Sequence, residues 1–303
     1  MNIFITGGTG FVGSILSSRL TEQGHHVTIL TRSLRADRPP MQGVSFLEGN
    51  PTKNGDWQEN VPDYDVIINL AGASIFKRWT KKNKRAIRDS RILTTRNLIE
   101  ALSARKGKVD LLLSASAVGY YGFHGDEELD EGSPPGNDFL ASVTQEWEAS
   151  ALEAEGYGVR VLPCRFGIVL GAKGGAIGKM IPPFKWYLGS PLGTGKQWFS
   201  WIHQQDLVNI FLFLMDTKNI SGPINATAPH PVRNQELTRI LGQVLKKPTF
   251  MPPVPGFLIK LIMGEFGSVL LKGQKALPRQ LTDMGFRFQY SDIREALEDL
   301  LVG

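Results

Sequence analysis

The chain of 303 residues contains one cysteine, Cys164. A single thiol excludes a disulfide within the chain and any metal site built from several cysteines, so we expect no bound metal. No apolar run approaches the roughly 20 residues that span a bilayer, and no signal-peptide pattern precedes the first strand-like segment, which begins at residue 2. These absences favour a cytoplasmic protein that has no membrane partner.

Charge of one sign is not in large excess either. The 34 Lys and Arg residues against 29 Asp and Glu residues give a net charge of +5. No nucleic-acid-binding motif stands out, and we expect no nucleic-acid partner. The length leaves room for one large α/β domain and a smaller lobe.

The first thirty residues contain a strand–turn–helix–strand pattern. Apolar residues predict strands at 3–5 and 27–30, with a helix between them. Gly7 would permit a tight turn, Gly10 would let a pyrophosphate approach the backbone, and Gly13 would let the helix pack close to the strand. The alternative is an ordinary glycine-rich turn. The residues expected to contact a dinucleotide here are Gly7, Thr9, Gly10, Phe11, Val12 and Gly13.

The end of the second strand indicates which dinucleotide is bound. An NAD site usually has an acid there that binds the ribose 2′-hydroxyl. This chain has Thr31, Arg32 and Ser33, with Arg35 close behind. A guanidinium pairs well with a 2′-phosphate, so the pattern favours NADP(H), bound mainly through Arg32. The alternative is a solvated surface arginine.

Strands and helices alternate through the first two thirds of the chain. This alternation predicts an α/β fold, a Rossmann-type doubly wound parallel sheet covered by helices on both faces. Residues 1–171, with a returning segment at about 197–230, are expected to form the NADP(H)-binding domain. Residues 172–303, richer in Gly and Pro at their start, are expected to form mostly a smaller C-terminal α/β substrate lobe. The predicted segments are strands at 44–47, 66–70, 111–113 and 159–163, helices at about 81–105 and 139–155, and a polar loop at 123–138.

Five motifs resemble those of the extended short-chain dehydrogenase/reductase superfamily. They are Thr6–Gly13, Asn69–Gly72, Leu113–Gly122, Leu162–Gly171 and Trp201–Val208. The resemblance implies further cofactor contacts at Leu70, Ala71 and Gly72. It also places Arg165 beside the nicotinamide as a candidate anion clamp, although an internal salt bridge is the alternative role for this arginine.

A second set of residues is similar to the "epimerase family" branch of that superfamily. These are Phe139-Leu-Ala, Trp147-Glu148, Gly264-Glu265, Gly273-Gln274, Pro278 and Gly285-Phe286. That branch ends in a C-terminal domain of unknown role, here at about 249–301. The resemblance does not supply a substrate.

The catalytic residues that the resemblance implies are present only in part. Ser116 matches the hydroxyl that orients the substrate, but Phe139 and Val143 stand where the superfamily has its Tyr and Lys. A phenol needs a lowered pKa to act as a base near neutral pH. Tyr120, or its neighbour Tyr121, and His203 are the candidate replacements. The alternatives are packing for the tyrosines and, for the histidine, a structural role with Asp206 as a helix cap.

Two further segments have more than one interpretation. Eight of the fifteen residues 77–91 are basic, which is typical of a solvated helix face. Alternatively, Arg91 reaches a cofactor phosphate or ribose, while the other bases attract an anionic substrate.

The apolar spacing between Phe257 and Leu271 is typical of core helices. A membrane-surface helix is the alternative, for which Lys260 and Lys272 are too few to form a basic face.

Together these patterns predict an NADP(H)-binding, atypical short-chain dehydrogenase/reductase. We expect an oxidoreductase or epimerase that acts on a small polar carbonyl or sugar compound, with an anionic compound as one alternative. Because Phe139 and Val143 replace the usual Tyr and Lys, a catalytically silent NADP(H)-binding regulator or sensor is the alternative. Either a monomer or a homodimer is compatible with the sequence.

Overall fold

The computed structural model describes residues 1–34, 42–103, 109–172 and 174–302. Its centre is a seven-stranded sheet in the order β12-β7-β5-β4-β1-β2-β3, in which every neighbouring pair is parallel. The predicted Rossmann-type fold is therefore confirmed. The strands are β1 (Asn2–Thr6), β2 (His26–Thr31), β3 (Val44–Glu48), β4 (Val66–Asn69), β5 (Leu111–Ala117), β7 (Arg160–Phe166) and β12 (Ile224–Ala226).

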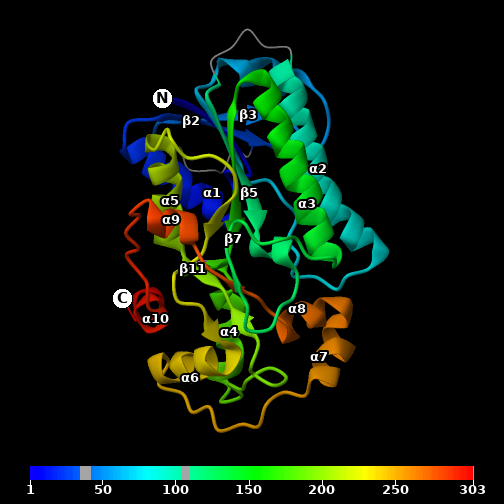
Figure 1. Ribbon diagram of the computed structural model, residues 1–303, viewed down its shortest axis with the longest axis vertical. Coiled ribbons are helices and arrows are strands. Elements are labelled where there is room, and N and C mark those ends of the chain that lie inside the picture. The colour runs from blue at the N-terminus through cyan, green and yellow to red at the C-terminus, as the bar shows by residue number, and fades with distance from the viewer. Residues whose placement is uncertain (35–41, 104–108, 173, 303) are drawn as a thin grey trace.

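Helices cover both faces of this sheet (Figure 1). They are α1 (Phe11–Glu22) and α5 (Gln204–Asp216) on one face, and α2 (Lys81–Ser103) and α3 (Phe139–Leu152) on the other. Successive strand residues point to opposite faces. Accordingly, Ile3 and Ile5 pack in the cluster with α1 and α5, whereas Phe4 packs in the cluster with α2 and α3. Burial of both faces explains why the strands read as continuous apolar runs.

The strand order reverses between β1 and β4. From β1 the chain proceeds outward to β2 and β3, and from β4 it proceeds the other way to β5, β7 and β12. Ligands of such sheets bind outside the carboxyl ends of the strands at this point. Buried polar side chains tie the two strand ends together. Thr6 Oγ1 donates to Asn69 Oδ1 at 2.7 Å, and Asn69 Nδ2 donates to Thr95 Oγ1 at 2.9 Å.

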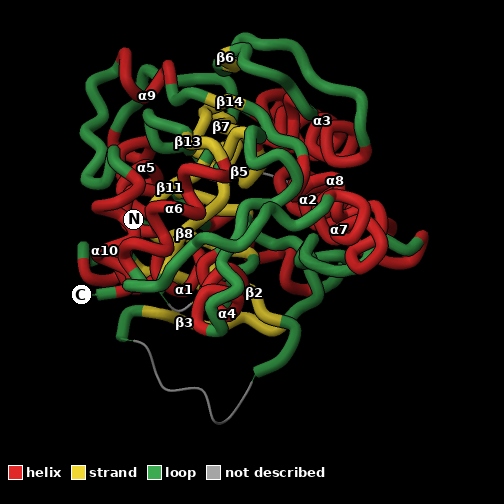
Figure 2. Tube along the Cα trace, turned by 90° about the horizontal axis from the view of Figure 1, so that it is seen from below, coloured by secondary structure: helices red, strands yellow, loops and turns green. Residues whose placement is uncertain are grey.

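The C-terminal half builds the lower part of the molecule, seen from below in Figure 2. Its strands are β8 (Ile168–Gly171), β9 (Gly174–Gly175), β10 (Trp198–Phe199), β11 (Trp201–His203) and β13 (Val232–Arg233). Its helices are α4 (Ile177–Lys185), α6 (Asn234–Val244), α7 (Gly256–Met263), α8 (Gly267–Leu271), α9 (Arg279–Asp283) and α10 (Ile293–Leu301). A 3-10 turn, η4 (Gly264–Phe266), joins α7 to α8.

The end of the chain is connected to the nucleotide-binding body at several points. Strand β14 (Lys275–Ala276) pairs with β6 (Glu128–Leu129), which lies inside the segment predicted as a loop. Leu281 of α9 is fully buried in the main core cluster. The buried Asp206 carboxylate accepts the backbone N–H groups of Gln289 and Tyr290 at 2.8 and 2.9 Å. Residues far apart in the sequence therefore stabilise one another.

The expectation that residues 257–271 are core was wrong for one side of α7. Phe257, Leu261 and Ile262 are 70–71% exposed, whereas Ile259 and Phe266 are buried. The helix spacing is regular, but α7 packs only through its inner side against η4 and α8. No helix in the described parts of the chain is long and apolar enough to cross a membrane.

Candidate functional site

The glycine turn after β1 has the geometry that a pyrophosphate needs. Gly7 has φ +71°, and a Cβ there would stand 2.7 Å from the Leu70 carbonyl carbon. A Cβ on Gly13 would stand 2.4 Å from Gly7 O, so only glycine allows this approach of α1 to the turn. Among the described residues, a Cβ on Gly10 would meet only Gly7 O, in a tight contact at 3.1 Å. The open side of Gly10, at the N-terminus of α1, is where a phosphate would accept backbone N–H groups.

The other predicted residues of the turn have different surroundings. Thr9 is exposed and Val12 packs partly against the main core. The Phe11 ring lies against the β8–β9 hairpin, 2.2 Å and 2.4 Å from where a Cβ on Gly171 or Gly174 would stand. Phe11 therefore supports the hairpin, and its contact with a cofactor stays a prediction.

The end of β2 presents a free guanidinium. Thr31 is buried and its hydroxyl donates to Ser33 O at 3.1 Å, while Arg32 is exposed. Arg32 makes no ion pair with any residue that the structure describes. Arg35 lies outside the described residues. An anion at this strand end would therefore find Arg32 without a competing carboxylate from the described residues.

A second arginine lies beside the end of β4. The partly buried Arg91 of α2 donates to the carbonyl oxygens of Ala73 and Ile87 at 3.1 and 2.9 Å, and its guanidinium lies 5.2 Å from the Trp147 ring. A Cβ on Gly72 would stand 3.1 Å from that guanidinium. No carboxylate within the described ranges pairs with it. Burial lowers the pKa of Arg91 to about 10, because desolvation penalises a cation that has no counter-ion.

Ser116 lies at the carboxyl end of β5 in a buried network. Its hydroxyl donates to Glu148 Oε1 at 2.5 Å. Arg165 of β7 donates to both oxygens of the same carboxylate, each at 2.8 Å. All three side chains are at most 8% exposed. Arg165 therefore forms an internal salt bridge with Glu148, which was the alternative role expected from the sequence. Its direct contact with a cofactor stays a prediction.

The two tyrosines after Ser116 differ. Tyr121 is fully buried, donates to Asn225 Oδ1 at 2.7 Å and accepts from Arg165 at 3.0 Å. Burial raises the pKa of Tyr121 to about 12, although Arg165 opposes the rise, so this phenol is a poor base. Tyr120 is only partly buried, and its ring stacks on the Arg165 guanidinium at 3.5 Å. Of the two, Tyr120 is the one that a ligand can reach.

Aromatic rings cover the position of the missing catalytic tyrosine. The Phe139 ring contacts Trp79 edge-on at 5.0 Å, and Lys84 Nζ lies 4.4 Å from its centroid. Trp79 in turn contacts Phe266, which belongs to the C-terminal domain, at 5.7 Å. Val143, at the position of the missing lysine, is 3% exposed. No ionisable group of α3 replaces the usual pair at these two positions.

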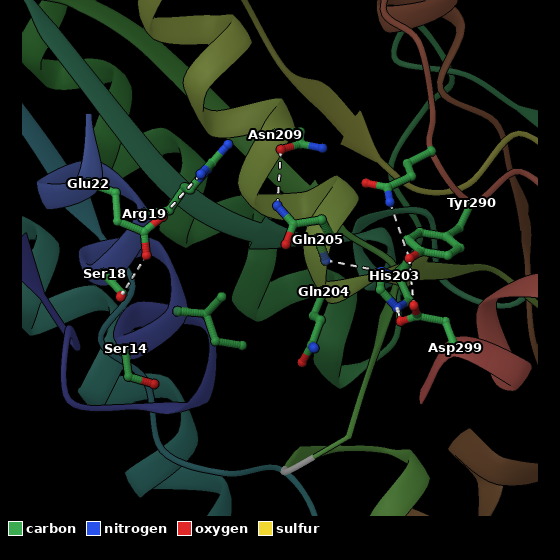
Figure 3. A pocket seen from close by; sticks show the side chains of 12 residues that line it. Ser14, Ser18, Arg19, Glu22, His203, Gln204, Gln205, Asn209, Tyr290 and Asp299 are labelled. Atoms are coloured by element: carbon green, nitrogen blue, oxygen red, sulfur yellow. Dashed lines mark hydrogen bonds and ion pairs between the residues drawn. The ribbon is translucent and has the colours of Figure 1, made fainter. Parts of the chain in front are cut away.

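His203 lies at the end of β11, beside the pocket shown in Figure 3. It borders a cavity of about 830 Å³ between α1, α5 and α10. Nδ1 accepts the backbone N–H of Gln205 at 3.1 Å, so the proton of the neutral ring is on Nε2. Nε2 is 3.2 Å from Asp299 Oδ2, at an angle that makes no hydrogen bond. Burial lowers the pKa of His203 against the opposing effect of Asp299, which favours the neutral ring.

Ser116 and His203 therefore do not share one cluster. The partners of Ser116 come from α3 and β7, whereas those of His203 come from α5 and α10. Glu148 was not predicted from the sequence as a site residue. An acid on the face of α3 that also carries Val143 and Trp147 was the available signal, because a buried acid needs a charged partner. Among the described residues, no group of His, Cys, Asp or Glu is arranged to hold a metal.

A doubly wound sheet with a glycine turn and arginines at its switch point defines a dinucleotide-binding protein. The model of the NAD dependent epimerase/dehydratase family matches residues 3–226, and the chain belongs to this family. A model of a domain of unknown function, DUF1731, matches residues 254–300. The resemblance to the epimerase-family branch is thereby confirmed.

Several relatives are similar over nearly the whole chain. The epimerase family protein SDR39U1 homolog, chloroplastic, of Arabidopsis thaliana is 40% identical, over 99% of this chain and 87% of its own. The epimerase family protein YfhF of Bacillus subtilis is 41% identical, over 99% of this chain and 98% of its own. The crystal structure of human epimerase family protein SDR39U1 with NADPH is 30% identical, with a TM-score of 0.86 and 99% of both chains covered. A nucleoside-diphosphate sugar epimerase of Corynebacterium glutamicum is 34% identical, with a TM-score of 0.78, over 98% of this chain and 57% of its own.

Proposed function

We propose that the chain binds NADP(H) and transfers hydride between the nicotinamide and a small polar, anionic carbonyl or sugar compound. One feature carries this proposal. Arg32 and Arg91 stand at the carboxyl edge of the sheet, and neither has a carboxylate partner among the described residues. A guanidinium binds phosphate oxygens through paired N–H groups, so each arginine suits an anion. The human relative that is 30% identical was crystallised with NADPH, which supports the choice of cofactor.

The residues present fit a dinucleotide. The open side of Gly10 leaves room beside the N-terminus of α1, where a pyrophosphate accepts backbone N–H groups. Arg32 would hold the 2′-phosphate, and Arg91, beside Gly72, would hold a phosphate or ribose oxygen. The nicotinamide supplies or accepts hydride when it is bound.

Ser116 sets a direction for hydrogen bonding to the substrate. Its single proton is directed at Glu148, so Oγ offers only lone pairs to a ligand. In this geometry Ser116 accepts a hydrogen bond from a substrate hydroxyl. A substrate carbonyl would require the Ser116 hydroxyl to turn away from Glu148. Tyr120, partly exposed on Arg165, is the nearby phenol that can exchange a proton with solvent.

A second candidate function is a catalytically silent NADP(H) sensor. Phe139 and Val143 favour it, because neither can replace the phenol and amine that tune proton transfer. Loss of NADPH absorbance in the presence of a panel of carbonyl compounds distinguishes the two functions. Binding without turnover on every compound would support the sensor and contradict the enzyme.

Arg32→Asp is expected to reverse the cofactor preference. The change removes a charge-assisted contact with the 2′-phosphate, worth about 1.5–3 kcal/mol, and gives the ribose 2′-hydroxyl of NADH an acceptor. The ratio of the NADH and NADPH dissociation constants measures it. Arg239→Asp, an equally exposed change on α6, is the control and should leave the ratio unchanged. An unchanged ratio in Arg32→Asp would place the 2′-phosphate elsewhere.

Ser116→Ala is expected to lower turnover by about a hundredfold while NADPH affinity stays the same. The substrate hydroxyl loses the acceptor that orients it, and a misplaced substrate costs about a hundredfold in rate. Initial rates of NADPH oxidation measure the change. Ser142→Ala, an exposed position on α3, is the matched control. Turnover that survives Ser116→Ala would mean that the chemistry occurs away from the end of β5.

A further inference from the structure

The lower end of the molecule carries an apolar surface that faces solvent. Helix α7 has the sequence GFLIKLIM, in which Lys260 is the only charged residue. A surface helix normally turns its apolar side toward the core. Helix α7 buries Ile259 and leaves Phe257, Leu261 and Ile262 70–71% exposed. Grouped exposed apolar residues of this size mark an interaction site.

A second group of exposed apolar side chains lies at the end of α4. Three consecutive residues after this helix, Trp186, Tyr187 and Leu188, are 77%, 54% and 56% exposed, and Phe250 is 77% exposed. Lys247 donates to the Tyr187 hydroxyl at 3.1 Å, so the segment that carries Phe250 lies beside these residues. Figure 1 places α4 and α7 in the lower half of the molecule. We call the following residues the lower apolar surface: Trp186, Tyr187, Leu188, Phe250, Phe257, Leu258, Leu261 and Ile262.

A basic cluster borders this surface. It consists of Lys77, Arg78, Lys81, Lys82 and Arg85, all exposed and none paired with a carboxylate in the described ranges. Two contacts hold it beside the end of α7. Lys84 pairs with Glu265 at 2.8 Å, and the Arg78 side chain lies 3.4 Å from where a Cβ on Gly264 would stand. The basic face that the C-terminal helices lack in sequence is therefore supplied by a distant part of the chain.

Positive charge is concentrated in the three segments that carry or border these exposed residues. Residues 71–88, 176–196 and 246–272 contain fourteen Lys and Arg residues and one acid, Glu265. The whole chain has 34 bases and 29 acids, so these segments carry +13 and all other residues together carry −8. The net charge of +5 is therefore distributed unevenly, and its positive part lies in segments beside exposed apolar side chains.

We propose that the lower apolar surface and the basic cluster dock on an anionic lipid bilayer. Trp and Tyr side chains partition to the headgroup level, Phe, Leu and Ile enter the acyl boundary, and Lys and Arg contact anionic headgroups. The surface offers these three kinds of side chain together. A second copy of the chain would bring two basic clusters of the same sign to one interface, which opposes association. The inference does not depend on the cofactor chemistry.

Co-sedimentation of the full chain with vesicles tests the proposal. Phosphatidylcholine vesicles with phosphatidylglycerol should bind the protein, and vesicles of phosphatidylcholine alone should bind it at least about tenfold more weakly. Raising the salt concentration should weaken the binding, because the contacts of the basic cluster are exposed. Equal binding to both vesicles, or no binding to either, would overturn the proposal.

Variants then assign the binding to these residues. Lys81→Glu with Lys82→Glu should weaken vesicle binding by more than about tenfold, since each basic residue contributes about fivefold. Acids in the first turn of α2 favour the helix, so this variant should fold. Lys53→Glu with Lys218→Glu changes the net charge equally at exposed sites outside the three segments and should bind almost normally. If this control weakens binding as much, net charge and not the cluster is responsible, and the proposal fails.

The apolar half of the surface has its own test. Phe257→Ser with Leu261→Ser should also weaken vesicle binding about tenfold, with an unchanged circular dichroism spectrum because both side chains are exposed. Unchanged vesicle binding would contradict insertion of α7. If lipid-free protein dimerises in light scattering and this variant is monomeric, the surface is covered by a second copy, and the bilayer proposal is wrong.

Discussion

Gly10→Val is expected to abolish measurable NADPH binding while the protein stays folded. Gly10 has an extended backbone (φ −81°, ψ 179°) that valine adopts readily, and among the described residues its Cβ would meet only Gly7 O at 3.1 Å. The added methyl groups would project to the open side of the turn, where a pyrophosphate must approach. Titration followed by nicotinamide fluorescence and a thermal melt measure the two effects.

Variants at two other glycines serve as controls for this prediction. Gly125→Val, where nothing lies within 4 Å of the new Cβ in the described structure, should change neither binding nor stability. Gly13→Val should instead destabilise the fold, since its Cβ would stand 2.4 Å from Gly7 O. If Gly10→Val binds NADPH at full affinity while its melt is normal, the pyrophosphate does not lie at this turn.

Breaking the buried pair of Glu148 and Arg165 is expected to lower the free energy of unfolding by about 3–5 kcal/mol. Glu148→Gln leaves the Arg165 guanidinium, which is 3% exposed, without its counter-charge. Arg165→Met likewise leaves the Glu148 carboxylate without its counter-charge. Chemical denaturation at neutral pH measures both. Glu153→Gln, exposed just after α3, is the control and should stay within about 0.5 kcal/mol of the natural protein.

The double variant Glu148→Leu with Arg165→Met tests whether the unpaired charge causes the loss of stability. Replacing both charges by apolar side chains removes the unpaired group, so much of the lost stability should return. A double variant that is no more stable than Arg165→Met alone would contradict the strong coupling that the two 2.8 Å contacts indicate. A loss below about 1 kcal/mol for Glu148→Gln would mean that solvent reaches the pair.

The sheet and its long helices could be predicted because their signals are local. Short apolar runs such as Val66–Ile68 identify buried parallel strands, and the turn glycines act through their own backbone. The short pairing of β6 with β14 was not predictable. Residues 123–138 have a loop composition, and their strand partner lies almost 150 residues away at Lys275.

The site was predicted unevenly for the same reason. The position of Ser116 follows from a motif along one strand, but its partner Glu148 is 32 residues away and becomes a partner only when α3 packs on β5. The motif that contains His203 does not reveal that the ring faces Asp299, which comes from the last helix of the chain. The exposure of α7 had no local signal either, because the spacing of apolar residues is the same for a buried helix.

A side-by-side titration of the natural protein with NADPH and NADH tests the central claim most directly. Arginines at the carboxyl edge of the sheet are expected to select the dinucleotide that carries a ribose 2′-phosphate. We expect NADPH to bind at least about tenfold more tightly, corresponding to a charge-assisted contact of about 1.5–3 kcal/mol with Arg32. Equal dissociation constants, or tighter binding of NADH, would contradict it.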